Sequence, residues 1–99
     1  MYKLLLHPNI EKQLAKTPAG YAKRLAAAMR MLREEPRPPD CKHLTQELYR
    51  VREGEYRIIY AIFDQEKVVF VGKIARRSEK VYRDIAVLLA SARQTVKDE

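Results

Sequence analysis

The sequence has little of the chemistry that would tie it to an oxidising compartment or to a metal. Its 99 residues include a single cysteine, Cys41, and no tryptophan. One thiol cannot form an internal disulfide, and it has no second thiol with which to hold a structural zinc. The N-terminal segment MYKLLLHPN has only a short apolar run, against roughly 7–15 residues in a signal peptide and ~20 in a membrane span. We therefore expect a cytoplasmic protein without a metal, a cofactor or a membrane partner.

Negative charge is also scarce. Thirteen acidic residues stand against 20 lysines and arginines, which leaves a formal charge of +7. The composition is 46% hydrophobic and 33% charged, which is typical of a folded domain rather than a disordered chain. A chain of this length can build one modest core. The charge excess favours a polyanionic partner such as nucleic acid, and the alternative is a charge that only keeps the protein soluble.

The N-terminal half predicts one strand and two helices. Residues 2–6 are apolar and stop before Pro8, so they predict a strand, and a short helix follows at about residues 9–16. Thr17 can cap the next helix, and Pro18 fits its first position. This helix of roughly four turns buries residues at spacings of four, four and three: Tyr21, Leu25, Met29 and Leu32.

The C-terminal half predicts three strands and a last helix. Prolines within residues 36–40 end the second helix, and a loop runs to about Gln46. The predicted strands are residues 48–52, 55–63 and 67–74. A helix starts near Ser78, with Val81, Ile85, Leu88 and Leu89 as its buried stripe, and residues 94–99 are expected to fray. The order β-α-α-β-β-β-α predicts one α+β domain over residues 1–99, with a small antiparallel sheet and helices packed on it.

The segment YRVREGEYRIIY, residues 49–60, concentrates positive charge in a predicted hairpin. If Glu53 and Gly54 form its loop, Arg50 lies opposite Arg57 and Val51 lies opposite Tyr56. Alternation then separates a core face from a charged face. The core face holds Tyr49, Val51, Tyr56 and Ile58, and the charged face holds Arg50, Arg52, Glu55 and Arg57. Opposed like charges destabilise a sheet, so this face is either a solvated surface or an anion-binding one.

A second basic segment, KIARRSEKVYR at residues 73–83, follows the last predicted strand. Its cations surround Tyr82 and are Lys73, Arg76, Arg77, Lys80 and Arg83. Arginine binds two phosphate oxygens at once, and tyrosine stacks on unpaired bases. The combination favours single-stranded RNA, whereas Tyr82 alone would be interpreted as a helix residue at the edge of the core.

Residues 43–84, HLTQELYRVREGEYRIIYAIFDQEKVVFVGKIARRSEKVYRD, resemble the RelE/ParE superfamily of bacterial and archaeal type II toxins. The resemblance implies a RelE-like fold and a toxin that cleaves messenger RNA, often on the ribosome. It also implies metal-independent chemistry, in which a ribose 2′-hydroxyl attacks the adjacent phosphate and leaves a 2′,3′-cyclic phosphate. The expected partners are mRNA, the ribosome and an acidic, partly disordered antitoxin, and no membrane is expected. The alternatives are a ParE-like gyrase poison that acts by protein binding, and an inactive chain that only binds the antitoxin.

The same resemblance assigns catalytic roles to four arginines. Arg50 and Arg52 lie on the predicted strand at residues 48–52, and Arg57 lies on the strand at residues 55–63. The fourth is Arg77 in the basic segment at residues 73–83, with Arg76 as the alternative. Tyr82 completes the set, and Lys73, Arg76, Lys80 and Arg83 are assigned to RNA binding. Well-known RelE sites have lysines at the positions of Arg50 and Arg52, and arginine effectively cannot lose its proton. The first candidate for the general base is therefore Tyr82, followed by Glu53 or Glu55. We expect surface or core-edge roles for His7 and His43.

Overall fold

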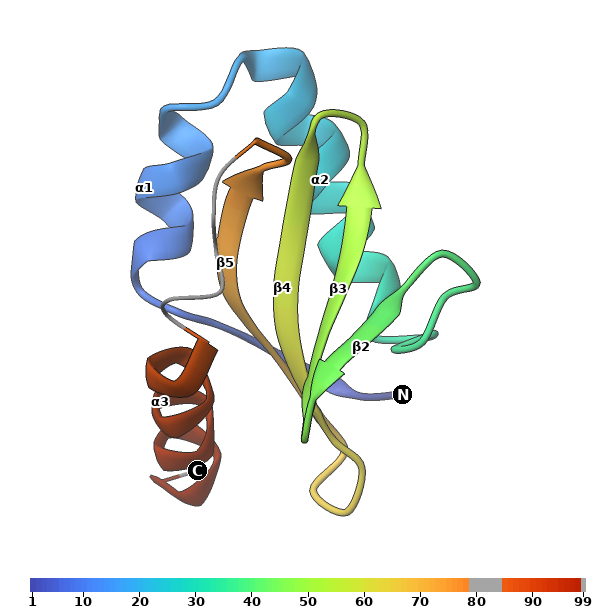
Figure 1. The fold of residues 1–99 in the computed structure, drawn as a ribbon, viewed down its shortest axis with the longest axis vertical. Helices are drawn as coiled ribbons and strands as arrows, with labels where there is room; N and C mark the ends of the chain where they lie inside the picture. The colour runs from blue at the N-terminus through green and yellow to red at the C-terminus, as the bar shows by residue number, and fades with distance from the viewer. Residues whose placement is uncertain (79–84, 99) are drawn as a thin grey trace.

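A five-stranded sheet with helices on both faces forms the protein in the computed structural model, which describes residues 1–78 and 85–98 (Figure 1). The elements are β1 (Lys3–Leu6), α1 (Asn9–Ala15), α2 (Ala19–Met31), β2 (Lys42–Thr45), β3 (Leu48–Glu53), β4 (Tyr56–Phe63), β5 (Val68–Arg76) and α3 (Ile85–Asp98). The strand order is β1-β5-β4-β3-β2. Only β1 pairs in parallel, with β5, and the other pairings are antiparallel. The α+β class and the mostly antiparallel sheet are confirmed.

Strand β2 lies where the sequence predicted a loop. It pairs with β3 in an antiparallel register that sets Lys42 opposite Arg50. Its four residues, KHLT, contain too few β-branched and aromatic residues to predict a strand. The strand forms because an edge of β3 offers unpaired backbone donors and acceptors, which pairing satisfies.

Helix α2 begins differently from the prediction. Thr17 does not cap it; the Thr17 hydroxyl donates to the carbonyl oxygen of Gln13 at 2.7 Å, and Pro18 is the N-cap residue. The predicted stripe is confirmed, since Leu25 and Met29 are buried and Tyr21 packs at the margin of the same core.

Strand β4 runs through the centre of the sheet and is covered on both faces. Helices α1 and α2 close one face over a core that includes Leu25, Ile58 and Tyr60. On the other face, Leu89 and Ala92 of α3 pack in a second cluster. This second cover reaches only one end of the sheet, because α3 lies away from the β3–β4 hairpin (Figure 1).

The last helix differs from the prediction at its C-terminal end. Residues 94–98 are helical rather than frayed, because Val96 packs against the second cluster and supplies the missing anchor. The buried position of Leu89 confirms part of the predicted stripe. Val81 and the predicted start of this helix after Ser78 lie outside the described residues.

The β3–β4 hairpin turns one residue later than predicted. Its loop consists of Gly54 and Glu55, so Arg52, rather than Arg50, lies opposite Arg57. The two registers differ by two residues in pairing, and therefore the strand residues keep their predicted faces, whereas Glu55 lies in the loop instead of on the charged face. Gly54 has a φ of +59° at the first loop position, as in a type II′ turn, which explains why the turn centres there.

A polar network ties the proline loop to the far end of the sheet. Arg37 makes a two-pronged ion pair with Asp64, at 3.1 and 2.8 Å, and donates to the Tyr49 hydroxyl at 3.2 Å. The Tyr2 hydroxyl donates to the same carboxylate at 2.7 Å. The hydrogen bond from Arg37, followed by that from Tyr2, lowers the pKa of Asp64. The bond to Asp64 raises the pKa values of Tyr2 and Arg37.

Tyr60 anchors the same loop from the core. Its ring is fully buried, and its hydroxyl donates to the carbonyl oxygen of Pro36 at 2.7 Å. Burial raises the pKa of Tyr60, so the phenol stays neutral and keeps its donor role. The loop that leads into β2 is thus fixed at both Pro36 and Arg37.

Gly54→Ala tests the geometry of the hairpin. A Cβ there would lie 2.7 Å from a ring carbon of Tyr21, and the positive φ strains any L side chain. We expect a loss of about 1–3 kcal/mol of unfolding free energy, measured by urea denaturation. Gly20→Ala is the matched control, because no atom lies within 4 Å of its Cβ position in α2, and it should gain about 0.5 kcal/mol. Similar stabilities for the two variants would contradict this account.

Asp64→Asn tests the polar network. The folded state lowers the pKa of Asp64, so its ionised form stabilises the fold above the ordinary value of about 3.9, and this contribution is lost as pH falls through the lower folded pKa. We expect the variant to lose about 0.5–1 kcal/mol at about pH 7 and to match the wild type near about pH 2. Urea denaturation at both pH values measures this, with Asp40→Asn as the control. A gap between Asp64→Asn and wild type that persists in acid would refute the ionic origin.

Candidate functional site

Four cations on neighbouring strands define a surface that we call the basic face: Lys42, Arg50, Arg52 and Arg57. Lys42 pairs with Arg50 across β2 and β3, and Arg52 pairs with Arg57 across β3 and β4, so all four share one side of the sheet. Arg50 and Arg57 are half-buried, whereas Lys42 and Arg52 are exposed. This is the side that α3 covers only at the opposite end.

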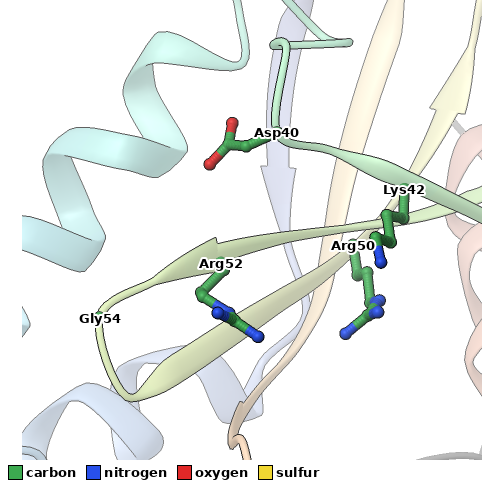
Figure 2. A pocket seen from close by; sticks show the side chains of 5 residues that line it. All are labelled: Asp40, Lys42, Arg50, Arg52 and Gly54. Carbon is green, nitrogen blue, oxygen red and sulfur yellow. The ribbon is translucent and has the colours of Figure 1, made fainter.

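A groove of about 400 Å³ opens on the basic face, beside β2 and β3. Figure 2 shows Lys42, Arg50 and Arg52 extending from the same side of these strands. Asp40 lies at the rim and directs its carboxylate away from the three basic side chains. Three cations therefore surround the opening without a facing carboxylate, which suits an anionic ligand.

Within the described residues, no ion pair compensates the charge of the basic face. Among residues 1–78 and 85–98, none of its four cations forms an ion pair. The carboxylate of Glu53 lies on the other side of β3 and pairs with Arg24 of α2 at 3.3 Å. The Nε atoms of Arg50 and Arg57 are buried without a hydrogen-bond partner in the described part of the chain. Each such donor lowers the unfolding free energy by about 1–3 kcal/mol. The basic face therefore destabilises the folded protein.

A second cavity, which we call the end groove, lies where the hairpin meets the end of β5. It measures about 590 Å³. Its lining is Pro18, Tyr21, Glu55, Tyr56, Arg57, Arg76, Arg77 and Ser78. The backbone N–H of Arg77 donates to the carbonyl oxygen of Glu55 at 2.9 Å, which holds the end of β5 against the hairpin turn. The structure thus brings Arg57 and Arg77 to one cavity.

A β-bulge in β5 decides which side the remaining cations face. The β4–β5 register shifts between Ile59 and Tyr60, which pair with Lys73 and Val71, and Gly72 is left without a partner. Lys73 consequently lies on the side of the basic face. Arg76 pairs with Tyr56 and lies on the opposite side, so the two adjacent arginines 76 and 77 are not equivalent.

The two histidines lie apart from the basic face. His7 accepts a hydrogen bond from the backbone N–H of Asn9, and the His43 ring lies 4.9 Å from that of Tyr49. Glu55 stays near Arg57 at the end groove. Tyr82, Lys80 and Arg83 lie outside the described residues. Sequence reasoning missed Lys42, because the residues of β2 carry no strand signal that would have placed it opposite Arg50.

Neither a metal site nor a membrane helix is found in the part of the chain that the structure describes. Within residues 1–78 and 85–98, no group of three or more histidines, cysteines or acids is placed to hold a metal ion. Over the same residues, no helix combines the length and the apolar character needed to cross a membrane.

Known proteins are similar to this chain in sequence and in fold. A family model described as "ParE toxin of type II toxin-antitoxin system, parDE" matches residues 4–81. A protein of Methanocaldococcus jannaschii described as "Putative toxin RelE1" is 28% identical over 88 residues, covering 84% of this chain and 97% of that protein. The RelE–RelB complex of Pyrococcus horikoshii OT3 contains a chain that is 29% identical, with a TM-score of 0.73 over 80% of this chain and 98% of that one.

The isolated RelE toxin of E. coli has the same fold, with a TM-score of 0.68 at 22% identity over 91% of this chain and 99% of that one. The relatives carry RelE names, whereas the family model is described by ParE. The chain belongs to the ParE toxin family of type II toxin–antitoxin systems, within the RelE/ParE superfamily.

Proposed function

We propose that this toxin is a metal-independent endoribonuclease that cleaves messenger RNA at the ribosome, in the cytoplasm. The observation that carries the proposal is the basic face, whose four cations have no ion pair within the described residues. Phosphate is the ligand that such a surface fits, because guanidinium groups bind its oxygens in pairs. The RelE names of the relatives support RNA over other polyanions. RelE–RelB complexes among them support an antitoxin as the protein partner.

In the proposed reaction, the ribose 2′-oxygen attacks the adjacent phosphorus and the bond from phosphorus to the 5′-oxygen breaks. The products are a 2′,3′-cyclic phosphate and a 5′-hydroxyl, so one proton leaves the 2′-hydroxyl and one reaches the leaving oxygen. Arg50 and Arg52 would hold the non-bridging oxygens at the groove. Arg57 and Arg77 would stabilise the charge that develops in the transition state.

The general base must come from another residue type, since arginine keeps its proton. The pairing of Glu53 with Arg24 removes it as a candidate, because that carboxylate lies on the opposite side of the sheet. Glu55 lines the end groove with Arg57 and stays a candidate. Tyr82 remains the first candidate for the general base. This stays a prediction from the sequence, because Tyr82 lies outside the described residues.

The second candidate function is inhibition of DNA gyrase by protein contact. The description of the matching family model by ParE favours it, because the same fold serves both kinds of toxin. A gyrase poison would not require free arginines around a scissile phosphate. The two functions therefore differ in what they predict for substitutions on the basic face.

Primer extension on a reporter message in a cell-free translation reaction distinguishes these functions. The wild type should give discrete cuts within translated codons. Arg57→Ala should weaken the cuts about 100-fold through lost charge stabilisation, and Tyr82→Phe by at least about 100-fold if it is the base. Arg30→Ala, which removes an exposed charge on α2, should leave them unchanged. An intact message together with trapped gyrase–DNA complexes would reject the nuclease in favour of the gyrase poison.

Arg52→Gln tests whether the basic face is maintained at a cost. Removing this charge relieves the repulsion with Arg57 directly opposite, so the unfolding free energy should rise by about 0.5 kcal/mol while cleavage falls. Arg24→Gln is the matched control on the other side of the hairpin. Arg24 has an ion pair with Glu53 and is about half exposed, and its loss should cost about 0.5 kcal/mol. Destabilisation by both substitutions in urea denaturation would show that the basic face is compensated.

A further inference from the structure

Arg76 marks a second basic surface, on the side of the sheet opposite to the basic face. It pairs with Tyr56 across β4 and β5, and its guanidinium lies over the Tyr56 ring, 6.0 Å from the centroid. The side chain is exposed and has no ion pair among the described residues. Its charge is therefore open to a ligand that reaches this side.

Two cavities meet at Arg76. One is the end groove, and the other is a cavity of about 300 Å³ beside α1, which we call the α1 groove. Both are lined by Arg76 and Tyr56, and the α1 groove adds Lys16 at the end of that helix. Lys73 also reaches the α1 groove, although its backbone register places it on the side of the basic face. Glu55 is the only acidic residue among the described residues that line the two cavities. The pair of grooves therefore forms a continuous positive surface.

Aromatic stacking holds Arg76 in place. The rings of Tyr21 and Tyr56 meet edge to face at 5.0 Å, and Arg24 lies over Tyr21 at 4.8 Å. The column Arg24–Tyr21–Tyr56–Arg76 thus places two aromatic rings between two arginines. A guanidinium stacked in this way keeps its N–H groups directed outward and loses less conformational entropy when it binds phosphate.

The start of α2 adds partial positive charge beside this column. Pro18 lines the end groove, and the first intrahelical bond of α2 runs from the Ala22 N–H to the carbonyl oxygen of Pro18 at 2.9 Å. The backbone N–H groups before Ala22 have no helical acceptor, and such groups favour phosphate. They reinforce the charge of the arginines at the same groove.

We infer that the end groove and the α1 groove bind the sugar–phosphate backbone of RNA next to the scissile phosphate, with Arg77, Arg76 and Lys16 as successive contacts. The inference rests on the proposed function for the identity of its ligand. Arg57 belongs to the basic face and also lines the end groove, so one strand of RNA can pass from the first surface to the second around the hairpin. Arginine beside tyrosine fits single-stranded RNA. An acidic peptide fits less well, because most of the described residues that line the two grooves are polar or charged, whereas peptide side chains are anchored mainly by apolar pockets.

Fluorescence anisotropy with uncleavable 2′-O-methyl RNA tests the inference without requiring cleavage. We expect Arg76→Ala and Lys16→Ala each to weaken binding of an oligonucleotide of about 10 residues by about fivefold at low salt, and to weaken binding of a dinucleotide less. The slope of log affinity against log salt should fall by about 0.7 for each cation removed. Arg30→Ala is the matched control for loss of an exposed arginine, and thermal melts verify that each variant folds.

Equal losses from Arg76→Ala and Arg30→Ala would overturn the inference, since binding would then depend on net charge alone. It would also be overturned if Arg76→Ala weakened binding of a polyglutamate peptide but not of RNA. Failure of the proposed function is a separate result. An intact message in the translation reaction, combined with Arg76-dependent binding of the uncleavable RNA, would reject the nuclease and retain the RNA surface.

Discussion

The burial of β4 on both faces is the constraint on which the rest of the structure depends. A strand at the centre of the sheet needs a covering layer on each side, and Ile58, Ile59 and Tyr60 are all fully buried. Helices α1 and α2 supply one layer along the sheet, whereas α3 supplies the other at one end only. Beyond the reach of α3, β4 can no longer present apolar side chains on that face. Arg57 occurs at this point, so the position of the candidate site follows from the extent of a helix.

The basic face lies at the end of the sheet that α3 does not cover, and the ion pairs of Arg37 and Arg93 lie in other parts of the protein. The basic face sets Arg52 opposite Arg57 and leaves the buried Nε atoms of two arginines without partners in the described part of the chain. Other ion pairs lie elsewhere, between Arg37 and Asp64 and between Arg93 on α3 and Glu47 at 2.9 Å. The acidic residues of these two turns are thus paired away from the site. A phosphate that entered the groove would supply the counter-charge that the described residues lack.

Much of this arrangement could be predicted from the sequence. The alternation of apolar and charged residues along a strand determines which side of the sheet each side chain faces, but it determines less firmly which residue lies opposite on the neighbouring strand. The division of the hairpin into apolar and arginine faces is right, although the loop contains Gly54 and Glu55, since registers that differ by two residues give the same alternation. Strand β2 was missed because its short, polar sequence has no strand signal and its pairing depends on the edge of β3. The prediction that Thr17 caps α2 was wrong, because its hydroxyl donates to the carbonyl oxygen of Gln13 instead. Such choices depend on tertiary neighbours.

The β-bulge at Gly72 was beyond sequence reasoning, and it separates the two basic surfaces. Without the bulge, the register of the first half of β5 would continue, Lys73 would point into the core, and Arg76 would share the side of Arg57. The shift instead buries Ile74 and moves Arg76 across the sheet, where the Tyr56 ring supports it. Gly72 suits this position because a Cβ there would lie 3.3 Å from Leu88 of α3. One extra residue in a strand therefore places cations on both sides of the sheet end, and a strand of RNA that contacts both must bend around the hairpin.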